Sequence, residues 1–411
     1  MTQGKKSSGN LYMFSISELP KSLNDCNITD FMDPYCVAQL ADDTSIKAES
    51  LISQTIKFQK VMNYATIKHQ HINTKKTKYM NMSSKPITTP IILNDDKVIN
   101  AVEIGDGYNF LGFKLTYSND VYHIIENNFK SKLFNVAKFY AWLQYNEQTP
   151  FFVKLKVLYG CMFPAILYSA EAWGNLKRIE TAIRTIETKA LKSCLGVKPG
   201  TTSDIVYCEL NRPDIISLIK DRQYKFRQKI ESSKQDEALM KEIWNLCNQE
   251  DNQNLCYYYR NIQDNNTSSN IEFRKSNIQH SENTMSIRYK TIIGFKYPSI
   301  LYNSCLNDET RKIISRWRLS SHKLKIESGR YTNPKTILAN RLCKICSVIE
   351  DEKHSIYHCR ANRTIREKYR NKLNLNDDNL PRFFNPDSIE EATNLAKYLN
   401  EIEKNMKELD I

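Results

Sequence analysis

Hydrophobic positions follow two different periods, and the change between them divides the chain into a strand-containing front part and a longer helical part. Apolar and polar residues form short strand-like runs in the front part, over residues 35–48, 74–80, 90–99 and 108–115. Between the first two runs, helical spacing predicts a helix over 50–69 that covers one face of a sheet. Its expected inward residues are Ile52, Ile56, Val61 and Ile67.

From about residue 120 to 235, apolar residues recur at intervals of three and four, which is typical of amphipathic helices. One predicted helix spans 125–140 and the next 152–162. A third runs over 179–190 and stops at Leu195-Gly196, since glycine commonly ends a helix. A further basic helix is predicted over 214–230.

Composition changes twice in the last third of the chain. Residues 245–285 are crowded with Asn, Gln, Ser and Asp, which predicts a linker or mobile loop because few apolar groups are available for a core. Residues 388–411 carry an apolar stripe and predict a helix that docks on its own domain: Ala392, Leu395, Leu399, Ile402, Met406 and Leu409. The predicted fold class is therefore α+β, and predominantly α.

Charge and cysteine usage indicate the partner and the compartment. The chain of 411 residues has a formal net charge of +13, which favours a polyanionic partner because lysine and arginine neutralise phosphates. A basic surface without such a partner is the alternative. No apolar run is long enough to cross a bilayer and no signal peptide is recognisable, so we expect a nuclear or cytoplasmic protein rather than a membrane or secreted one. The 11 cysteines indicate reduced thiols.

The C-terminal part contains a cysteine and histidine pattern with metal-ligand spacing. Cys343, Cys346, His354 and Cys359 form Cys-x2-Cys-x7-His-x4-Cys, and thiolates with imidazole suit a closed, tetrahedral structural Zn²⁺ site. His358 also lies at zinc-binding distance in sequence from His354. The residues alone therefore leave open whether His358 or Cys359 is the fourth ligand. Buried thiols and surface histidines are the alternative to a metal site.

Asp42 and Asp43 follow Leu40-Ala41 at the tip of a predicted strand–turn–strand. Two carboxylates at a hairpin tip can hold Mg²⁺, which prefers oxygen ligands and keeps waters for substrate phosphates. An Asp-Asp pair is also ordinary turn chemistry. The pair therefore indicates a catalytic metal only if neighbouring motifs support it.

Three further motifs stand in a fixed order around Asp42-Asp43. They are Gln3-Gly4 with Ser8, Lys76-Thr77, and Phe110-Leu111-Gly112. In order and spacing the chain resembles the second half of a reverse transcriptase from a non-LTR (LINE-type) retrotransposon. Lys5 and Lys6 stand where that family usually has a proline, and Leu40 replaces its usual aromatic residue.

The resemblance implies an incomplete right-hand polymerase palm, an α-helical thumb and a small zinc module that commonly has Cys-Cys-His-Cys ligands, which favours Cys359. The corresponding divisions are residues 1–117 for the partial palm, 118–235 for the thumb, 236–310 for a polar connector, and 311–411 for the zinc-binding module with its terminal helix. The basic and aromatic residues of 316–322 fit this module as a surface that stacks on bases and holds phosphates.

The resemblance also implies roles for single residues. Asp42, Asp43 and Lys76 would be catalytic, with Mg²⁺ on the two aspartates. Gln3, Gly4 and Ser8 would contact nucleotide and template, and Leu111 and Gly112 would form the primer grip. A nucleic-acid duplex would run along the thumb residues Arg178, Arg184, Lys189 and Lys192, for which an exposed helix face is the alternative.

The expected function is RNA-directed DNA polymerisation on an RNA template and a DNA primer or target, with no small-molecule substrate beyond the dNTPs. The family uses a further aspartate on a strand before the Gln-Gly segment, and only Met1-Thr2 precede Gln3. We therefore expect a truncated palm that does not polymerise by itself. The alternative function is a non-catalytic nucleic-acid-binding remnant with a structural zinc site.

Overall fold

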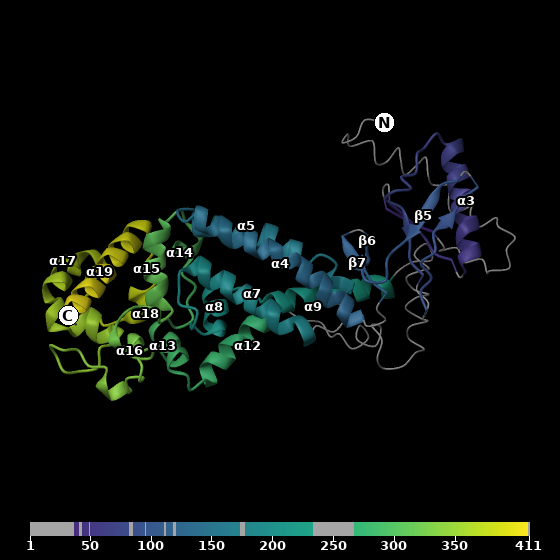
Figure 1. Ribbon diagram of the computed structural model, residues 1–411. Helices are drawn as coiled ribbons and strands as arrows, with labels where there is room; N and C mark the ends of the chain where they lie inside the picture. The colour runs from purple at the N-terminus through teal and green to yellow at the C-terminus, as the bar shows by residue number, and fades with distance from the viewer. Residues whose placement is uncertain are drawn as a thin grey trace. The chain divides into compact units, whose positions relative to one another are not determined.

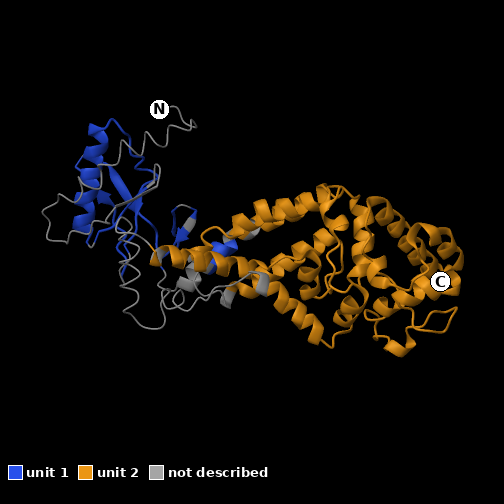
Figure 2. Ribbon diagram, turned by 180° about the vertical axis from the view of Figure 1, so that it is seen from behind, with its two compact units in different colours: residues 1–130, 237–242 blue, residues 131–236, 243–411 orange. Residues whose placement is uncertain are grey.

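The structure is a computed structural model, and it describes residues 37–40, 43–48, 50–81, 85–94, 96–110, 112–117, 121–172, 177–232 and 267–409 (Figure 1). Within these residues the chain is mostly helical with small sheets, as predicted. It divides into two compact units (Figure 2). Unit 1 comprises residues 1–130 and 237–242, and unit 2 comprises residues 131–236 and 243–411. Unit 2 therefore contains most of the segments predicted as thumb and connector, and all of the segment predicted as zinc module.

Among its described residues, unit 1 contains the helix α3, the beginning of a second helix, and three small sheets. The sheets are a β1–β2 hairpin, a three-stranded sheet in the order β3-β5-β4, and a β6–β7 hairpin. The elements are β1 (Val37–Leu40), β2 (Asp43–Ile46), α3 (Leu51–Ile67), β3 (Lys78–Tyr79), β4 (Ile91–Ile92), β5 (Val98–Ala101), β6 (Tyr108–Phe110) and β7 (Phe113–Leu115). β5 pairs in parallel with β3 and antiparallel with β4.

The predicted helix over 50–69 is confirmed as α3. Of its four predicted inward residues, only Val61 is buried, and the prediction is wrong for Ile52, Ile56 and Ile67. Ser50 caps the helix by accepting a hydrogen bond from the Ser53 amide at 3.1 Å. Ile52 and Ile67 are 75% and 74% exposed, whereas Phe58 and Met62 are buried against the three-stranded sheet. The aromatic and thioether side chains fill the space over the sheet, so the helix is rotated away from the isoleucine face.

The strand predicted over 108–115 is instead a hairpin, formed by β6 and β7. Gly112 lies between the two strands with φ of +75°, a conformation that favours glycine, so it turns the chain rather than continuing a strand. Asn128 then ties β7 to the following helix, because its side chain accepts from the Lys114 amide at 2.6 Å and donates to the Lys114 carbonyl at 2.9 Å.

Unit 2 is helical and starts within α4 (Val121–Tyr145). Its other α-helices in the described residues are α5 (Phe151–Val157), α6 (Phe163–Ile166), α7 (Lys177–Leu195), α8 (Ser203–Leu210), α9 (Ile215–Glu231), α12 (Thr267–His280), α13 (Thr284–Ile292), α14 (Ser299–Asn303), α15 (Asp308–Arg318), α16 (Lys325–Ser328), α17 (Arg363–Leu373), α18 (Leu380–Phe383) and α19 (Ile389–Glu408). A π-helical turn over Leu158–Met162 joins α5 to α6. The helices predicted from the three-and-four spacing are thereby confirmed.

The prediction of a linker over 245–285 is wrong for its last part. Residues 267–280 form α12, which packs against α8 and α9, and α13 begins at Thr284. Arg274 of α12 explains how so polar a helix can pack. Its guanidinium pairs with Asp204 and with the buried Asp214, and it lies 4.1 Å from the ring centroid of Tyr207.

The predicted C-terminal helix is confirmed as α19, and so is its docking on its own domain. Its predicted stripe is buried at Ala392, Leu395, Leu399, Ile402 and Met406. α19 packs against α15 and α17, and the hydroxyl of Tyr398 donates to the Ile356 carbonyl at 2.6 Å. α19 is therefore the element that joins the helical core to the cysteine-containing segment.

The core of unit 2 also contains buried charged side chains. Arg318 of α15 makes two hydrogen bonds to Glu209 of α8, at 2.6 and 3.0 Å, and both side chains are fully buried. Tyr302 and Tyr289 donate to the same carboxylate at 2.7 and 2.9 Å. Every charge in this cluster is paired, which is the condition under which ions are tolerated in a core.

Candidate metal centre

The first two cysteines are held by a tight turn before α17. Leu342 and Ile349 form an isolated antiparallel bridge. Inside it, the Cys343 amide donates to the Val348 carbonyl at 2.8 Å, and the Ser347 amide donates to the Cys343 carbonyl at 2.9 Å. Ser347 adopts a left-handed φ of +56°. The hydrogen bonds hold the loop closed, so the two thiols of the Cys-x2-Cys segment are on one side of it.

A π-helical turn over His354–His358 brings the remaining ligands to these cysteines. The Cys359 amide donates to the His354 carbonyl at 2.7 Å, an i→i+5 hydrogen bond. This wider turn accommodates one more residue than an α-helical turn, and such insertions are common at functional sites. Cys359 itself is extended, which directs the chain out of the turn.

The four side chains converge on one point, as the spacing predicted. The ligand atoms of Cys343, Cys346, His354 and Cys359 all lie within 4.8 Å of one another. The sulfurs of Cys343 and Cys359 are 3.8 Å apart. Two sulfurs bound to one tetrahedral zinc at about 2.3 Å would be separated by about 3.8 Å. The cluster could therefore hold a metal ion.

The surroundings fit a metal site as well. His354 Nε2 is buried without a hydrogen-bond partner among the described residues, and a buried orphan of this kind needs a ligand. The Arg360 amide donates to Cys346 Sγ at 3.4 Å, a backbone N–H contact of the kind that supports a ligating sulfur. Burial lowers the pKa of His354, which favours the neutral imidazole that a metal needs. Burial raises the pKa of the Cys359 thiol to about 12, so a cation that binds there would have to displace the thiol proton.

The structure places Cys359, and not His358, in the cluster. His358 is exposed, and its Nε2 lies 3.0 Å from an oxygen of Asp378, away from the cluster. Cys359 is buried and its sulfur belongs to the cluster. The π-helical turn decides this outcome, because it places position 359 rather than 358 beside His354.

The other predicted site residues have different environments. Gln3, Gly4, Ser8, Asp42 and Leu111 lie outside the described residues. The strand–turn–strand prediction is confirmed for the rest of its hairpin, in which Leu40 pairs with Asp43 at the turn end. Lys76 is exposed and Gly112 is in the β6–β7 turn, so neither is enclosed in a pocket.

The predicted thumb cations are not equivalent. Arg184 is half-buried and pairs with Glu180 at 2.8 Å and with Asp214 at 2.5 Å. Lys192 donates to the Pro199 carbonyl at 2.8 Å, whereas Lys189 is exposed. Arg178 lies in α7, and only its backbone is described.

The expectation that residues 316–322 stack on bases is wrong for Trp317, Arg318 and His322. All three side chains are essentially fully buried. His322 accepts from the Leu324 amide through Nδ1, so Nε2 carries the proton that is donated to Glu352 at 2.8 Å. Arg288 pairs with the same Glu352 and with Glu327. The segment therefore contributes a polar core rather than a stacking surface.

The sequence analysis did not predict this core network, because its partners are far apart along the chain and leave no local signal.

No family model matches this chain, and no curated protein is recognisably similar to it. Among the described residues, no helix combines the length and the apolar character needed to cross a membrane.

Proposed function

We propose that this chain is a nucleic-acid-binding protein related to the reverse transcriptases of non-LTR retrotransposons, with a structural Zn²⁺ in its C-terminal module. The observation that carries the proposal is the assembled set of three thiols and one imidazole next to a strongly basic helix. Such a donor set suits Zn²⁺, and four protein ligands leave no open position for a substrate. The ion would hold the Cys343–Cys346 loop to Cys359, at the start of the segment that leads into α17.

The basic helix is α17, with five cationic side chains and one acidic one. Arg363 pairs with Glu367 within the helix, and Lys368 pairs with Glu401 of α19. Arg360, in the turn before α17, and Arg370 of α17 are exposed and have no acidic partner in the described part of the chain. Exposed, unpaired arginines favour binding to a phosphate backbone.

The Cys359 carbonyl accepts a hydrogen bond from Arg366 at 3.2 Å, which connects the basic helix to a metal ligand. Tyr369 of the same helix donates to Glu401 at 2.7 Å and anchors it on α19. The cations of α17 are thus held by a docked scaffold. Rigid placement of this kind lowers the entropy lost when a strand binds.

The test is binding of the full chain to labelled single-stranded RNA and to an RNA–DNA duplex, followed by fluorescence anisotropy. The double variant Arg360→Gln/Arg370→Gln should weaken both affinities by about tenfold, because each cation neutralises about one phosphate. The matched control is Lys397→Gln/Lys407→Gln, which removes the same charge from exposed positions of α19. Equal losses in the two variants would contradict a site formed by Arg360 and α17.

A second candidate function is polymerisation, and the β1–β2 hairpin favours it because Asp43 begins β2 at the turn end. By resemblance Asp42 and Asp43 would hold Mg²⁺ near the primer end, and Lys76 would contact phosphate. Primer extension on poly-rA/oligo-dT with Mg²⁺ tests this. Primer extension by the wild type that disappears in Asp43→Asn would establish polymerisation. Nucleic-acid binding without primer extension would support the binding function only.

A further inference from the structure

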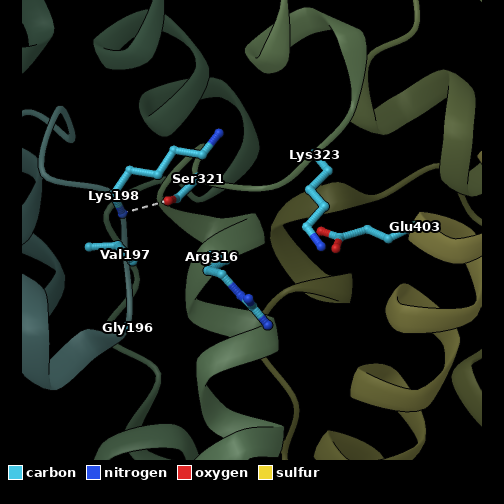
Figure 3. Close-up of a pocket in the computed structure, with 7 residues that line it drawn as sticks. All are labelled: Gly196, Val197, Lys198, Arg316, Ser321, Lys323 and Glu403. Atoms are coloured by element: carbon cyan, nitrogen blue, oxygen red, sulfur yellow. Dashed lines mark hydrogen bonds between the residues drawn. The ribbon is translucent and has the colours of Figure 1, made fainter. Parts of the chain in front are cut away.

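A cavity of about 250 Å³ lies within unit 2, where three distant segments meet. Residues 196–198 follow α7, Arg316 lies in the last turn of α15, Ser321 and Lys323 follow that helix, and Glu403 comes from α19. Figure 3 shows the side chains of Arg316, Lys323 and Glu403 pointing into a common space between these elements. The volume equals that of about eight water molecules in the liquid, room for one small anionic group with some waters.

The walls of this cavity are fixed by backbone geometry. Gly196 has φ of +72°, and a Cβ there would come within 2.6 Å of Lys312 Cγ, so a side chain is not tolerated. On the other side, Ser320 adopts φ of +51°, and the Ser321 amide donates to the Arg316 carbonyl at 2.6 Å, which ends α15 in a closed turn. The Lys198 amide donates to Ser321 Oγ at 2.8 Å and joins the two walls.

The polar groups of the cavity offer donors that lack acceptors. Arg316 Nε is buried and has no hydrogen-bond partner among the described residues. Ser321 Oγ already accepts from Lys198, so its proton is available to donate. Neither Arg316 nor Lys323 forms an ion pair within the described part of the chain. Lys198 is engaged through Nζ with the His322 carbonyl at 3.2 Å, so it supplies charge rather than a contact.

The charge balance identifies the type of ligand. Three cations and one carboxylate line the cavity, a formal excess of two positive charges, although the Lys198 side chain points away from the other three (Figure 3). The carboxyl ends of α7 and α15 each add about half a negative charge, which leaves an excess of about one. A phosphodiester carries a single negative charge, and its oxygens suit both a guanidinium and a hydroxyl donor.

We propose that this cavity binds one backbone phosphate of a nucleic-acid strand, through Arg316, Lys323 and the hydroxyl of Ser321. The assignment of this phosphate to a nucleic-acid strand rests on the proposed nucleic-acid-binding function. Glu403 opposes the ligand and limits its affinity, since its carboxylate faces the same space. This position is on the helical core, separate from the metal ligands.

The experiment uses the full chain and two probes: a labelled single-stranded RNA, and inorganic phosphate as a competitor at constant ionic strength. Arg316→Gln and Lys323→Gln should each weaken RNA binding by about fivefold to tenfold and reduce the salt slope by about 0.7, the value for one single-strand phosphate. Glu403→Gln should strengthen binding several-fold, an opposite effect that a loss of folding cannot produce. Lys404→Gln, which removes a charge from an exposed neighbour on α19, is the matched control.

Phosphate should compete with RNA on the wild-type chain and lose this effect in Arg316→Gln. Direct titration of inorganic phosphate, followed by calorimetry, separates the sources. Loss of phosphate binding in Arg316→Gln with unchanged RNA affinity would overturn the assignment to a strand. If no variant of the chain binds RNA, the proposed function fails while calorimetry still tests the cavity. The site itself would be overturned if Arg316→Gln and Lys323→Gln both had the same affinity as Lys404→Gln for each probe.

Discussion

At the residue scale, the largest energies belong to buried charged groups rather than to the exposed cations. Arg318 is surrounded by acceptors: besides Glu209, it donates to the carbonyls of Phe384 at 2.6 Å and Lys296 at 3.0 Å. Burial by itself would lower the pKa of Arg318, but the facing Glu209 carboxylate outweighs this and raises it. The arginine therefore stays charged, and it connects α15 to α8 and to the segment after α18.

Arg318→Met should destabilise the chain by about 3–5 kcal/mol, because it leaves Glu209 buried without its counter-charge. The double variant Glu209→Gln/Arg318→Met should recover a substantial part of this loss, since no uncompensated charge remains. Urea unfolding measures both. Arg363→Met is the control, as it breaks an exposed pair with Glu367. A loss in Arg318→Met no larger than in the control would contradict the argument.

Glu187 of α7 predicts a dependence of stability on pH. Burial raises its pKa to about 8, although it accepts hydrogen bonds from the Tyr207 hydroxyl at 2.5 Å and the Ile215 amide at 2.9 Å. The ordinary pKa of a glutamate, 4.5, applies to the unfolded chain. Between pH 4.5 and about pH 8, Glu187 therefore keeps its proton in the folded chain and has lost it in the unfolded chain. The contribution of Glu187 to the free energy of unfolding therefore falls as pH rises, by up to about 1.4 kcal/mol per pH unit.

The test compares the wild type with Glu187→Gln in urea unfolding from pH 5 to pH 8. The stability of the variant relative to the wild type should increase with pH over this window, since the amide does not titrate. Glu282→Gln, at an exposed position before α13, should show no such trend. A constant difference between Glu187→Gln and the wild type would refute the raised pKa.

At the element scale, the π-helical turn over His354–His358 determines which side chains can bind a metal. The cap of α17 and the packing of α19 fix this turn from both sides, since Asn362 donates to the Ser355 carbonyl at 2.9 Å and Tyr398 to the Ile356 carbonyl. Neighbouring positions in this turn therefore have opposite roles. Cys359 faces the cluster, and His358 faces Asp378.

Cys359→Ser should abolish tight zinc binding, and His358→Asn should leave it unchanged. Elemental analysis of the purified full chain should find about one zinc per wild-type chain, since four soft or borderline ligands close one tetrahedral site. His358→Asn is a matched control because it removes a zinc-competent side chain from the adjacent position. Zinc lost from His358→Asn but kept by Cys359→Ser would show that the fourth ligand is assigned wrongly.

At the scale of the whole molecule, the net charge of +13 is distributed over paired and unpaired cations. Many arginines of unit 2 are neutralised internally, as Arg274, Arg288, Arg311 and Arg318 show. The cations available to a polyanion are therefore fewer than the composition suggests. They include the exposed face of α17 and Lys189 of α7.

Binding of the full chain to RNA should nevertheless weaken by at least about tenfold between about 50 and 200 mM salt, since several phosphates are neutralised at once. Anisotropy titrations with oligonucleotides of unrelated sequence should give similar affinities, because backbone contacts carry no sequence information. An affinity that does not change with salt would contradict the proposal.

Some features of this protein were determined by the sequence alone, and each of them depends on residues that are close together along the chain. Cys343, Cys346 and His354 of the candidate metal centre were predictable from their spacing, whereas the π-helical turn decided between Cys359 and His358. The stripe of α19 was predictable because helical periodicity repeats over 20 residues. The β1–β2 hairpin was predictable for the same reason, since its two strands are adjacent in the chain.

Only the tertiary structure decided which charges are core and which are surface. Arg318 and Glu209 are separated by 109 positions, and Arg316, two residues earlier on the same helix, instead lines the cavity beside residues 196–198. The buried face of α3 and the packing of α12 were likewise set by distant partners. The physical reason is the cost of burying a charge or leaving a gap, which depends on what the fold places opposite a side chain.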